Sequence, residues 1–259
     1  MFQNLLRIQV EAHFPKNTRG RPALLSFDDA YDDILKVVRT GMQWRQLQPK
    51  HVSFITVFKT MHKWNKADVF RVAYQNLLRL YSRRRRPRYY AVDSSFVKNI
   101  YGSDCVGRNP TDRGRKASKM PCIVDDLGVP FGVLFTPANQ SDLKLFDSTL
   151  NSTLTPLDLG KELYADKGYD SKANRAVCAR HGLRDRIFRR RTKNGRRTHA
   201  RRGIIERFFS WVDKYRRLLV RYEKYISVYT SMTFLACGMM LQLRFQNLNV
   251  SIQHEQLVS

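Results

Sequence analysis

Acidic residues are scarce in this chain. Its 259 residues include 22 Asp and Glu against 47 Lys and Arg, which gives a formal net charge of +25. A field of this sign attracts polyanions and speeds encounter with them, so nucleic acid is the favoured partner and an anionic membrane the second choice. A ribosome-like structural binder, or nonspecific adhesion, is the plainer alternative. The few acids that stand in basic surroundings therefore become the first candidates for a site.

Cysteine is scarce as well. The four cysteines, Cys105, Cys122, Cys178 and Cys237, lie far apart and form no C-x-x-C pair. This spacing argues against a zinc site and against a disulfide framework. It indicates reduced, mostly buried thiols in an intracellular protein.

Long apolar runs are also missing, although an apolar content of 42% is enough for a core. The N-terminus has no apolar segment behind a basic start, as a secretory signal would have. The most apolar stretch, residues 228–243, is short for a membrane span and contains Thr230, Ser231 and Gln242. We expect a buried helix there and no membrane contact. The expected location is the cytoplasm, in association with the nucleoid, or the nucleus if the host is a eukaryote or its virus.

Residues 1–82 predict an all-α, helix-turn-helix-like DNA-binding domain. After a weakly structured lead of about 20 residues, Ser26 is expected to cap a helix that stops at Gly41. Further helices are expected after Ser53 and over residues 67–80, with Leu80 facing inward. Three short helices with tight connections are typical of a DNA reader, and small helical bundles without a DNA role share the pattern.

Residues 83–88 read Arg-Arg-Arg-Arg-Pro-Arg. Such a run is not expected to pack into a core, so we interpret it as a basic linker that grips phosphates. A solvated hinge is the alternative, and in a eukaryotic host the run would suit a nuclear import signal.

From Tyr89 onward the pattern changes to alternating strands and helices, which predicts an α/β catalytic domain over residues 89–245 and a C-terminal tail over 246–259. Strands are expected at 89–97, 122–126, 129–136, 162–165 and 186–188. Helices are expected after Ser141, from Ser171 to about residue 181, over 202–222 and over 228–243.

Three acids in this region are candidates for chemistry. Asp93 stands in mid-strand, where an unpaired buried carboxylate costs several kcal/mol unless a metal ion or an arginine neutralises it. Asp166 ends a strand before a glycine-containing loop, where many acids only form turns. Glu206 lies near the start of the long predicted helix, where a cap or a salt bridge is the alternative.

The expected strand order can bring these carboxylates together. Two carboxylates on neighbouring strands and a third from a helix can hold two magnesium ions, because magnesium prefers hard oxygen ligands. Such a pair of ions can activate an attacking oxygen and stabilise a leaving oxygen. The set therefore predicts an enzyme that cuts or joins nucleic acid.

Several ordered motifs extend from about residue 20 to residue 245. They read Arg-Thr-Gly-Met-Gln-Trp-Arg-Gln-Leu at 39–47, Val-Gly-Arg-Asn-Pro-Thr-Asp-Arg-Gly-Arg-Lys at 106–116, Ala-Asn-Gln-Ser-Asp at 138–142, Ala-Asp-Lys-Gly-Tyr-Asp at 165–170 and Ile-Glu-Arg-Phe-Phe-Ser-Trp at 205–211. In these motifs the chain resembles the IS5 family of insertion-sequence transposases, within the IS4-like group that carries a DDE site. The resemblance implies an RNase H-like fold, a mixed sheet flanked by helices.

By this resemblance Asp93, Asp166 and Glu206 fall on the family's catalytic, metal-binding acids, with Mg²⁺ as cofactor and Mn²⁺ as a substitute. The family signature around the third acid is Tyr, two residues, Arg, three residues, Glu, six residues, Lys. Arg202 and Glu206 match it. The sequence departs from it at His199, which replaces the tyrosine, and at Asp213, which replaces the lysine one position before Lys214.

The resemblance also implies the reaction. A DNA transposase cleaves a phosphodiester at each element end and joins the freed 3′-hydroxyl to target DNA. The N-terminal helices would recognise the terminal repeats of double-stranded DNA, and a homodimer on the DNA would hold both ends. A captured, catalytically idle DNA-binding protein and a nuclease of the same fold without strand transfer are the rival interpretations.

Phosphate contacts are expected from basic side chains near the candidate acids. The loop 107–119 and the tract 184–202 are both rich in arginine and lysine, with a solvated loop as the alternative for the first. The residues expected to contact DNA are Arg113, Arg115, Lys116, Lys119, Arg202, Lys214 and Arg217. Trp211 and Tyr215 have the ring chemistry for base stacking, but their helical spacing favours core packing.

Overall fold

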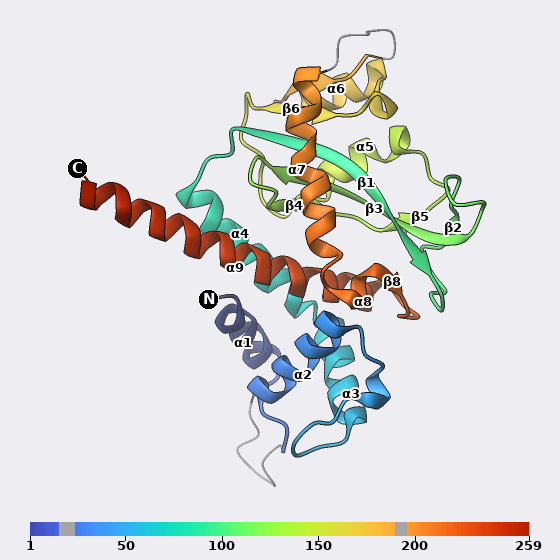
Figure 1. Ribbon diagram of the computed structural model, residues 1–259, viewed down its shortest axis with the longest axis vertical. Helices are drawn as coiled ribbons and strands as arrows, with labels where there is room; N and C mark the ends of the chain where they lie inside the picture. Colours follow the sequence, from blue (N-terminus) through green and yellow to red (C-terminus); the bar gives the residue numbers. More distant parts are fainter. Residues whose placement is uncertain (16–23, 190–195, 259) are drawn as a thin grey trace. The chain divides into compact units, whose positions relative to one another are not determined.

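The computed structural model describes residues 1–15, 24–189 and 196–258, and for 196–202 and 248–258 it describes the backbone alone. The chain divides into two compact units (Figure 1). A helical unit comprises Met1–Tyr81, Tyr215–Leu218 and Ser227–Ser259, and a sheet unit comprises Ser82–Lys214 and Leu219–Ile226.

The helical unit begins with a helix that the sequence analysis did not predict. The weakly structured lead is wrong for residues 2–13, because α1 (Phe2–His13) is helical there. Phe2, Leu6 and Val10 recur every four residues and are buried, so this short helix is stabilised by packing of one apolar stripe. The ring of Phe2 lies so close to Gly238 that an added Cβ there would come within 2.4 Å of it.

The predicted helices of this unit are confirmed, although the third spans Val69–Arg84 instead of 67–80. Helix α2 (Phe27–Thr40) is capped by Ser26, whose Oγ accepts a hydrogen bond from the backbone N–H of Asp29 at 3.1 Å. It stops at Gly41, which has a left-handed φ of 72°. A short 3₁₀ turn (Trp44–Gln46), α3 (Phe54–Lys66) and α4 (Val69–Arg84) follow. Leu80 was expected to face inward and is 38% exposed, because α4 packs through a stripe one position further along, at Tyr81.

The last helix, α9 (Ile226–Val258), packs mainly with these N-terminal helices. Tyr31 donates a hydrogen bond to the sulfur of Met239 at 2.9 Å, and the rings of Tyr74 and Phe234 stack with centroids 5.7 Å apart. The predicted catalytic domain over 89–245 and tail over 246–259 therefore differ from the observed division. The segment Ile226–Asn247 is long and apolar enough to cross a membrane, but 67% of its most apolar window is buried, which agrees with the predicted buried helix.

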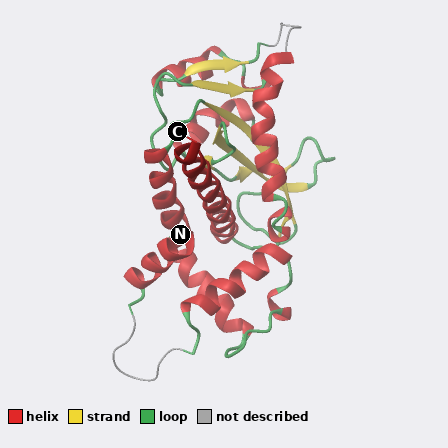
Figure 2. Cartoon of the chain, turned by 60° about the vertical axis from the view of Figure 1, so that its left-hand side comes forward, coloured by secondary structure: helices red, strands yellow, loops and turns green. Residues whose placement is uncertain are grey.

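The sheet unit is built on one mixed sheet, drawn in yellow in Figure 2. Its strands in chain order are β1 (Tyr89–Asn99), β2 (Gly107–Arg108), β3 (Lys116–Asp125), β4 (Pro130–Val133), β5 (Thr136–Pro137), β6 (Glu162–Ala165), β7 (Arg184–Ile187) and β8 (Val220–Arg221). The main path runs β2-β3-β1-β6-β7. Strand β3 is antiparallel to β1, whereas β6 is parallel to both β1 and β7. The predicted mixed sheet is confirmed.

Helices line this sheet. Helix α5 (Asp142–Asn151) packs against β3 and β4, and α6 (Lys172–Arg180) packs against β7. Helix α7 (Arg196–Val212) packs against β1, β3 and β6, and Figure 1 shows it running across these strands. The single helix predicted over 202–222 is wrong. It breaks after Val212 into the one-turn helix α8 (Arg216–Leu219) and strand β8, whose ladder with the end of β1 overrides the helical periodicity.

The basic run at 83–88 is partly tied to the sheet unit through Arg85 and Arg88, whereas Arg83, Arg84 and Arg86 are exposed, so phosphate contact by the run stays a prediction. Arg85 donates to Asp125 at 3.1 Å and to Asp126 at 2.6 Å, and Arg88 Nε donates to Asp126 at 2.8 Å. Both carboxylates are buried at the turn between β3 and β4. A buried carboxylate needs such partners, so these arginines are held by the protein itself.

Candidate active site

The fold brings two of the three predicted acids next to each other. In the parallel pair β1 and β6, the last paired residues are Ala91 and Tyr164, and the same offset continued for two residues aligns Asp93 with Asp166. Asp166 directly follows β6 and keeps an extended backbone, with φ −72° and ψ 166°. Adjacent strands lie about 5 Å apart and residues opposite one another point to the same face, so the two carboxylates are neighbours.

Each aspartate is anchored by the backbone beside it. The N–H of Ser94 donates to Asp93 Oδ1 at 2.9 Å, and the N–H of Lys167 donates to Asp166 Oδ1 at 2.7 Å. Asp166 thereby caps the 3₁₀ turn η2 (Lys167–Tyr169). Asp166 therefore also forms a turn, as the alternative interpretation expected. The side chains of Asp93 and Asp166 are both half-exposed.

The pair faces α7. Ser94 Oγ donates to Asp142 of α5 at 2.6 Å, which places the side chain of Ser94 on the α5 face of the sheet. Side chains alternate along a strand, so Asp93 lies on the opposite face. That is the face against which α7 packs.

Glu206 lies on α7 but is not gathered with the pair. Helix α7 buries Ile205, Phe208 and Val212 as one stripe, and Glu206 lies off this stripe and is exposed. Within the described ranges, no group of three or more His, Cys, Asp or Glu side chains is arranged to hold a metal ion. The fold therefore supplies two adjacent carboxylates and a third one on a helix that covers the same face.

The carboxylate oxygens of these residues are suitable ligands for a divalent cation. Asp93 and Asp166 present hard oxygen ligands side by side, as Mg²⁺ and related ions prefer. Two carboxylates with several water ligands are a common way for proteins to bind Mg²⁺. Glu206 of α7 is the third predicted ligand.

Behind Asp93, on the α5 face, lies a buried polar cluster that sequence reasoning missed. Lys119 of β3 is 3% exposed, and its Nζ donates to the carbonyl oxygen of Gln140 at 2.7 Å and to Asp142 at 3.1 Å. The same ammonium lies 4.9 Å from the ring centroid of Phe96. Lys119 was expected to contact DNA, and this is wrong, because its charge is used inside the protein. The sequence signals were the position of Asp142 within the motif at 138–142 and that of Lys119 just after the motif at 106–116.

Tyr169 joins this cluster from η2. It is 2% exposed, and burial raises the pKa of its hydroxyl well above the usual value, with the carboxylates of Asp142 and Asp93 adding to the effect. The phenol therefore stays neutral at all ordinary pH values. Because Tyr169 is three residues from Asp166 and Ser94 is next to Asp93, this cluster supports both aspartates from behind.

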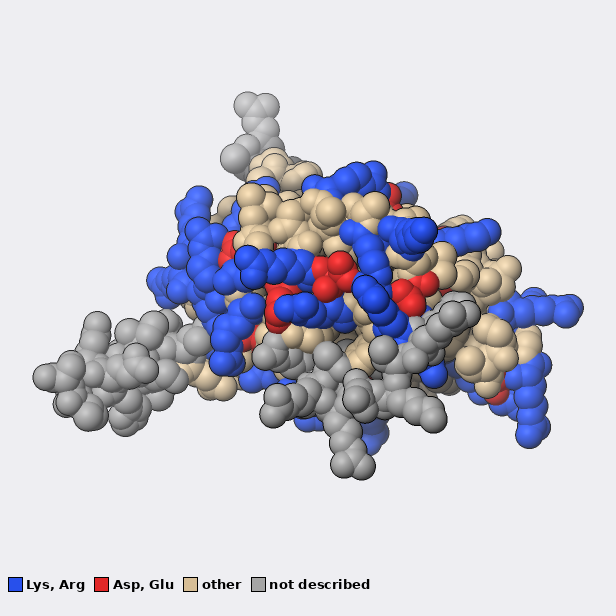
Figure 3. All heavy atoms as spheres, turned by 90° about the horizontal axis from the view of Figure 1, so that it is seen from above, with Lys and Arg blue, Asp and Glu red and all other residues tan. Residues whose placement is uncertain are grey.

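The remaining basic candidates divide by exposure. Arg113, Arg115 and Lys116 are exposed in the loop before and at the start of β3, and Arg115 lies 3.8 Å from Asp112 in a weak surface ion pair. Lys and Arg side chains spread widely over the surface, as the view in Figure 3 shows.

Arg217 is not a surface residue. It is 7% exposed and donates to the carbonyl oxygen of Met42 at 3.3 Å within the helical unit, so its predicted DNA contact is wrong. Lys214 is exposed. The side chain of Arg202 lies outside the described residues. Tyr215 is buried, in agreement with the core packing favoured for it.

Comparison with known proteins decides the family. Residues 84–241 match the family described as the transposase DDE domain. The chain belongs to this family. A putative transposase for insertion sequence element IS402 from Burkholderia cepacia is 31% identical over 166 residues, which cover 61% of this chain and 75% of that protein. A putative transposase for IS6501 from Brucella ovis is 28% identical over 128 residues, 47% of this chain and 95% of that protein.

The fold agrees with this assignment. The structure of a piggyBac transposase synaptic complex with hairpin DNA, determined by cryo-EM, superposes with a TM-score of 0.51 at 9% identity and covers 92% of this chain and 70% of that one. The predicted RNase H-like fold is thus confirmed, and the chain is a DNA-cleaving and DNA-joining enzyme of the DDE class, which depends on divalent metal. Its placement in the IS5 subgroup stays a prediction.

Proposed function

We propose that Asp93, Asp166 and Glu206 are the catalytic carboxylates of a magnesium-dependent insertion-sequence transposase, with Mn²⁺ as a working substitute. The reaction is cleavage of a phosphodiester at each element end, followed by attack of the freed 3′-hydroxyl on target DNA. The observation that carries this assignment is the register of β1 and β6, which aligns Asp93 with Asp166 on the face covered by α7.

The protein's own contribution is positioning. Backbone N–H groups of Ser94 and Lys167 orient the two aspartates, and the buried cluster around Asp142 keeps β1, β3 and η2 in place behind them. Glu206 adds the third carboxylate from α7. When bound, divalent metal supplies positive charge that favours the attacking oxygen as a nucleophile and stabilises the leaving oxygen.

DNA binding is assigned to two surfaces. Arg113, Arg115, Lys116 and Lys214 are exposed cations of the sheet unit that are suited to phosphate contacts. The predicted N-terminal domain, residues 1–82, is proposed to recognise the terminal repeats with its helices. Two copies of the chain would hold both ends of an element, and the cytoplasmic nucleoid is the proposed place of action.

The test compares isosteric variants that remove one charge each. Asp93→Asn, Asp166→Asn and Glu206→Gln are measured for Mg²⁺-dependent cleavage of a duplex carrying the inverted repeat that flanks the gene. Each should lose at least about 100-fold in cleavage rate, because charge stabilisation by the metal amounts to several kcal/mol. Duplex binding, measured by gel shift, should be retained.

Asp147→Asn is the matched control, because Asp147 is a half-exposed carboxylate on α5 of the same unit that forms a surface ion pair with Arg180 at 3.2 Å. It should cleave at the wild-type rate. Full activity of the Asp93 or Asp166 variant would remove the proposed site, whereas full activity of the Glu206 variant alone would remove only the third ligand.

A further inference from the structure

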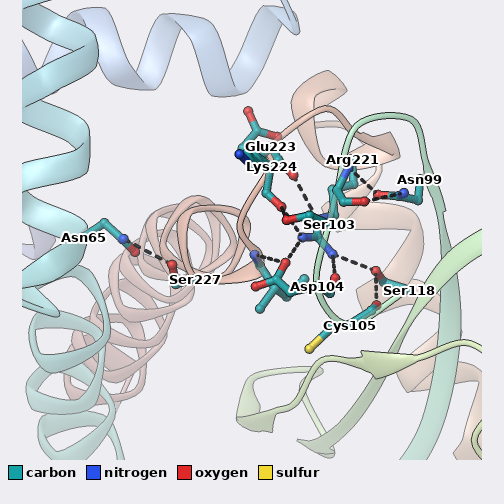
Figure 4. Close-up of polar contacts among 12 residues, drawn as sticks. Asn65, Asn99, Ser103, Asp104, Cys105, Ser118, Arg221, Glu223, Lys224 and Ser227 are labelled. Carbon is teal, nitrogen blue, oxygen red and sulfur yellow. Dashed lines mark hydrogen bonds and ion pairs between the residues drawn. The ribbon is translucent and has the colours of Figure 1, made fainter. Parts of the chain in front are cut away.

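One buried arginine organises the end of the sheet unit remote from the aspartate pair. Arg221 of β8 is 0% exposed, and Figure 4 shows its guanidinium enclosed by two chain segments. Its Nε donates to the carbonyl of Glu223 at 3.1 Å, and its Nη2 donates to the carbonyl of Lys224 at 3.0 Å and to the carboxylate of Asp104. Its Nη1 donates to the carbonyl of Asp104 at 2.6 Å and to Ser118 Oγ at 3.1 Å. Every N–H of the side chain is used, so residues 99–105 and 220–226 are fastened to each other and to β3.

The first of these segments is a closed loop that carries an exposed tyrosine. The side chain of Asn99 accepts from the N–H of Gly102 at 2.9 Å and donates to its carbonyl at 3.1 Å, which closes the loop over two residues (Figure 4). Tyr101 lies at the tip and is 70% exposed. A side chain this exposed adds little to the stability of the core, although hydrogen bonds close the loop that holds it.

The second segment presents its own exposed rings. Arg221 and Glu223 are buried, and Tyr222 between them is 42% exposed. The rings of Tyr222 and Tyr101 lie with centroids 6.2 Å apart, tilted by 49°. Tyr225, 50% exposed, follows on the same segment. We call Tyr101 and Tyr222 the tyrosine platform.

Exposed cations lie on the segments that carry the tyrosine platform and on the strands beside them. Lys98 of β1 lies opposite Ala117 of β3, the residue after Lys116. Arg108 of β2 lies opposite Lys116. These three cations and Lys224 are exposed. The nearby acid Asp104 is paired with the buried Arg221, so it does not balance them. Strand pairing thus links the end of β1, which precedes Tyr101, to the basic loop that ends at Lys116.

We propose that the tyrosine platform binds unpaired bases of a DNA strand, while these exposed cations hold its phosphates. Exposed aromatic rings beside lysine and arginine are the combination by which proteins bind single-stranded nucleic acid, because every base offers a flat face for stacking. This inference rests on the proposed action on DNA and adds a second contact surface to it. The end of β1 at Asn99, two residues before Tyr101, lies about 20 Å from Asp93, six residues at about 3.3 Å each, so the platform holds DNA beyond the scissile bond.

A second copy of the chain is a poorer occupant of this surface. Two copies would bring like-charged faces together in a protein of net charge +25, and like charges oppose association. DNA complements both the cations and the tyrosine rings, because its phosphates pair with the cations and its bases stack on the rings.

The experiment measures the affinity of the full chain for two fluorescein-labelled probes, a single-stranded thymidine 20-mer and a 20-base-pair duplex, by fluorescence anisotropy. Tyr101→Ala and Tyr222→Ala should each weaken binding of the single strand about ten-fold, because one stacked base contributes about 1–3 kcal/mol. Duplex affinity should change by less than about two-fold. The variant with both tyrosines replaced by Phe should bind the single strand like the wild type, because it keeps both rings.

Leu159→Ala is the matched control, since Leu159 is 78% exposed in the same unit, and it should change neither affinity. Photocrosslinking of a 20-mer containing 5-iodouracil should label Tyr101 or Tyr222. Unchanged single-strand affinity in the double alanine variant, equal losses for both probes, or loss in the Phe variant would each overturn the proposal. The proposal would also be overturned if the wild type forms an oligomer without DNA and a platform variant does not form it.

The outcome separates this inference from the proposed function. If the platform variants and the wild type bind the single strand alike while end cleavage still requires Asp93, only the tyrosine platform is refuted. If the Asp93→Asn variant cleaves element ends at the wild-type rate, the proposed site fails whatever the platform variants do.

Discussion

Replacement of Arg221 by lysine should destabilise the protein strongly although the charge is kept. The guanidinium satisfies carbonyl oxygens of Asp104, Glu223 and Lys224, the hydroxyl of Ser118 and the carboxylate of Asp104. An ammonium has three N–H donors and cannot reproduce the planar fork, so at least two of these acceptors lose their partner. An unsatisfied buried acceptor costs about 1–3 kcal/mol. The expected loss in the free energy of unfolding is therefore about 3 kcal/mol, with a range of about 2–6 kcal/mol.

Urea denaturation at pH 7, followed by circular dichroism, measures this loss, and a thermal scan should show a midpoint lower by about 6–12 °C. Arg86→Lys is the matched control, because Arg86 also pairs with an aspartate in the sheet unit but its side chain is 77% exposed. An exposed pair contributes about 1 kcal/mol or less, so this variant should lose little. If Arg221→Lys proves no less stable than Arg86→Lys, the guanidinium does not fasten the two segments as argued.

Two further perturbations test the packing of each unit. Burial raises the pKa of Asp126, but hydrogen bonds from arginines of the 83–88 run outweigh this and leave its pKa below the usual value. Its contribution to stability is thus present above the unfolded pKa of about 3.9 and is lost as the pH falls through the lower folded pKa. Asp126→Asn should lower the free energy of unfolding by about 2–3 kcal/mol at pH 7, measured by urea titration. On acidification to pH 3, this variant should lose less stability than the wild type does. An equal loss on acidification would contradict the assignment. Gly41→Ala should cost about 2 kcal/mol or more, because φ is +72° and the new Cβ would lie 2.9 Å from Arg216 Cβ. Gly160→Ala, with φ +74° and open space around it, should cost only about 1 kcal/mol in the same titration, and equal losses would show that the contact at Gly41 is unimportant.

Local signals in the sequence predicted many element boundaries correctly. Ser26 and Gly41 bound α2 as expected, and β6 spans the predicted residues, 162–165. These features depend on neighbours within a few residues, such as an N-cap oxygen or a left-handed stop, so a sequence window contains the relevant physics. The alternation along β1 likewise placed Asp93 on the correct strand.

The failures share a different cause. Lys119 and Arg217 were assigned to DNA on charge alone, and both are buried with internal acceptors. Charge at a sequence position does not tell whether a carbonyl or carboxylate from a distant segment will meet it. The same holds for the end of α7 at Val212. The helical spacing of apolar residues continues past this point in the sequence, but pairing of β8 with β1 competes with it.

The sequence by itself determined the basic character of the protein, its α/β class and the three acids of the proposed site, because composition, periodicity and motif spacing are properties of the chain. The tertiary structure decided which of these acids meet. It set a β1–β6 register that aligns Asp93 with Asp166 and left Glu206 off the buried stripe of α7. It also enclosed Arg221 between two segments that carry exposed tyrosines. Strand register and burial depend on contacts between residues far apart in the chain, and these contacts form only when the whole core packs.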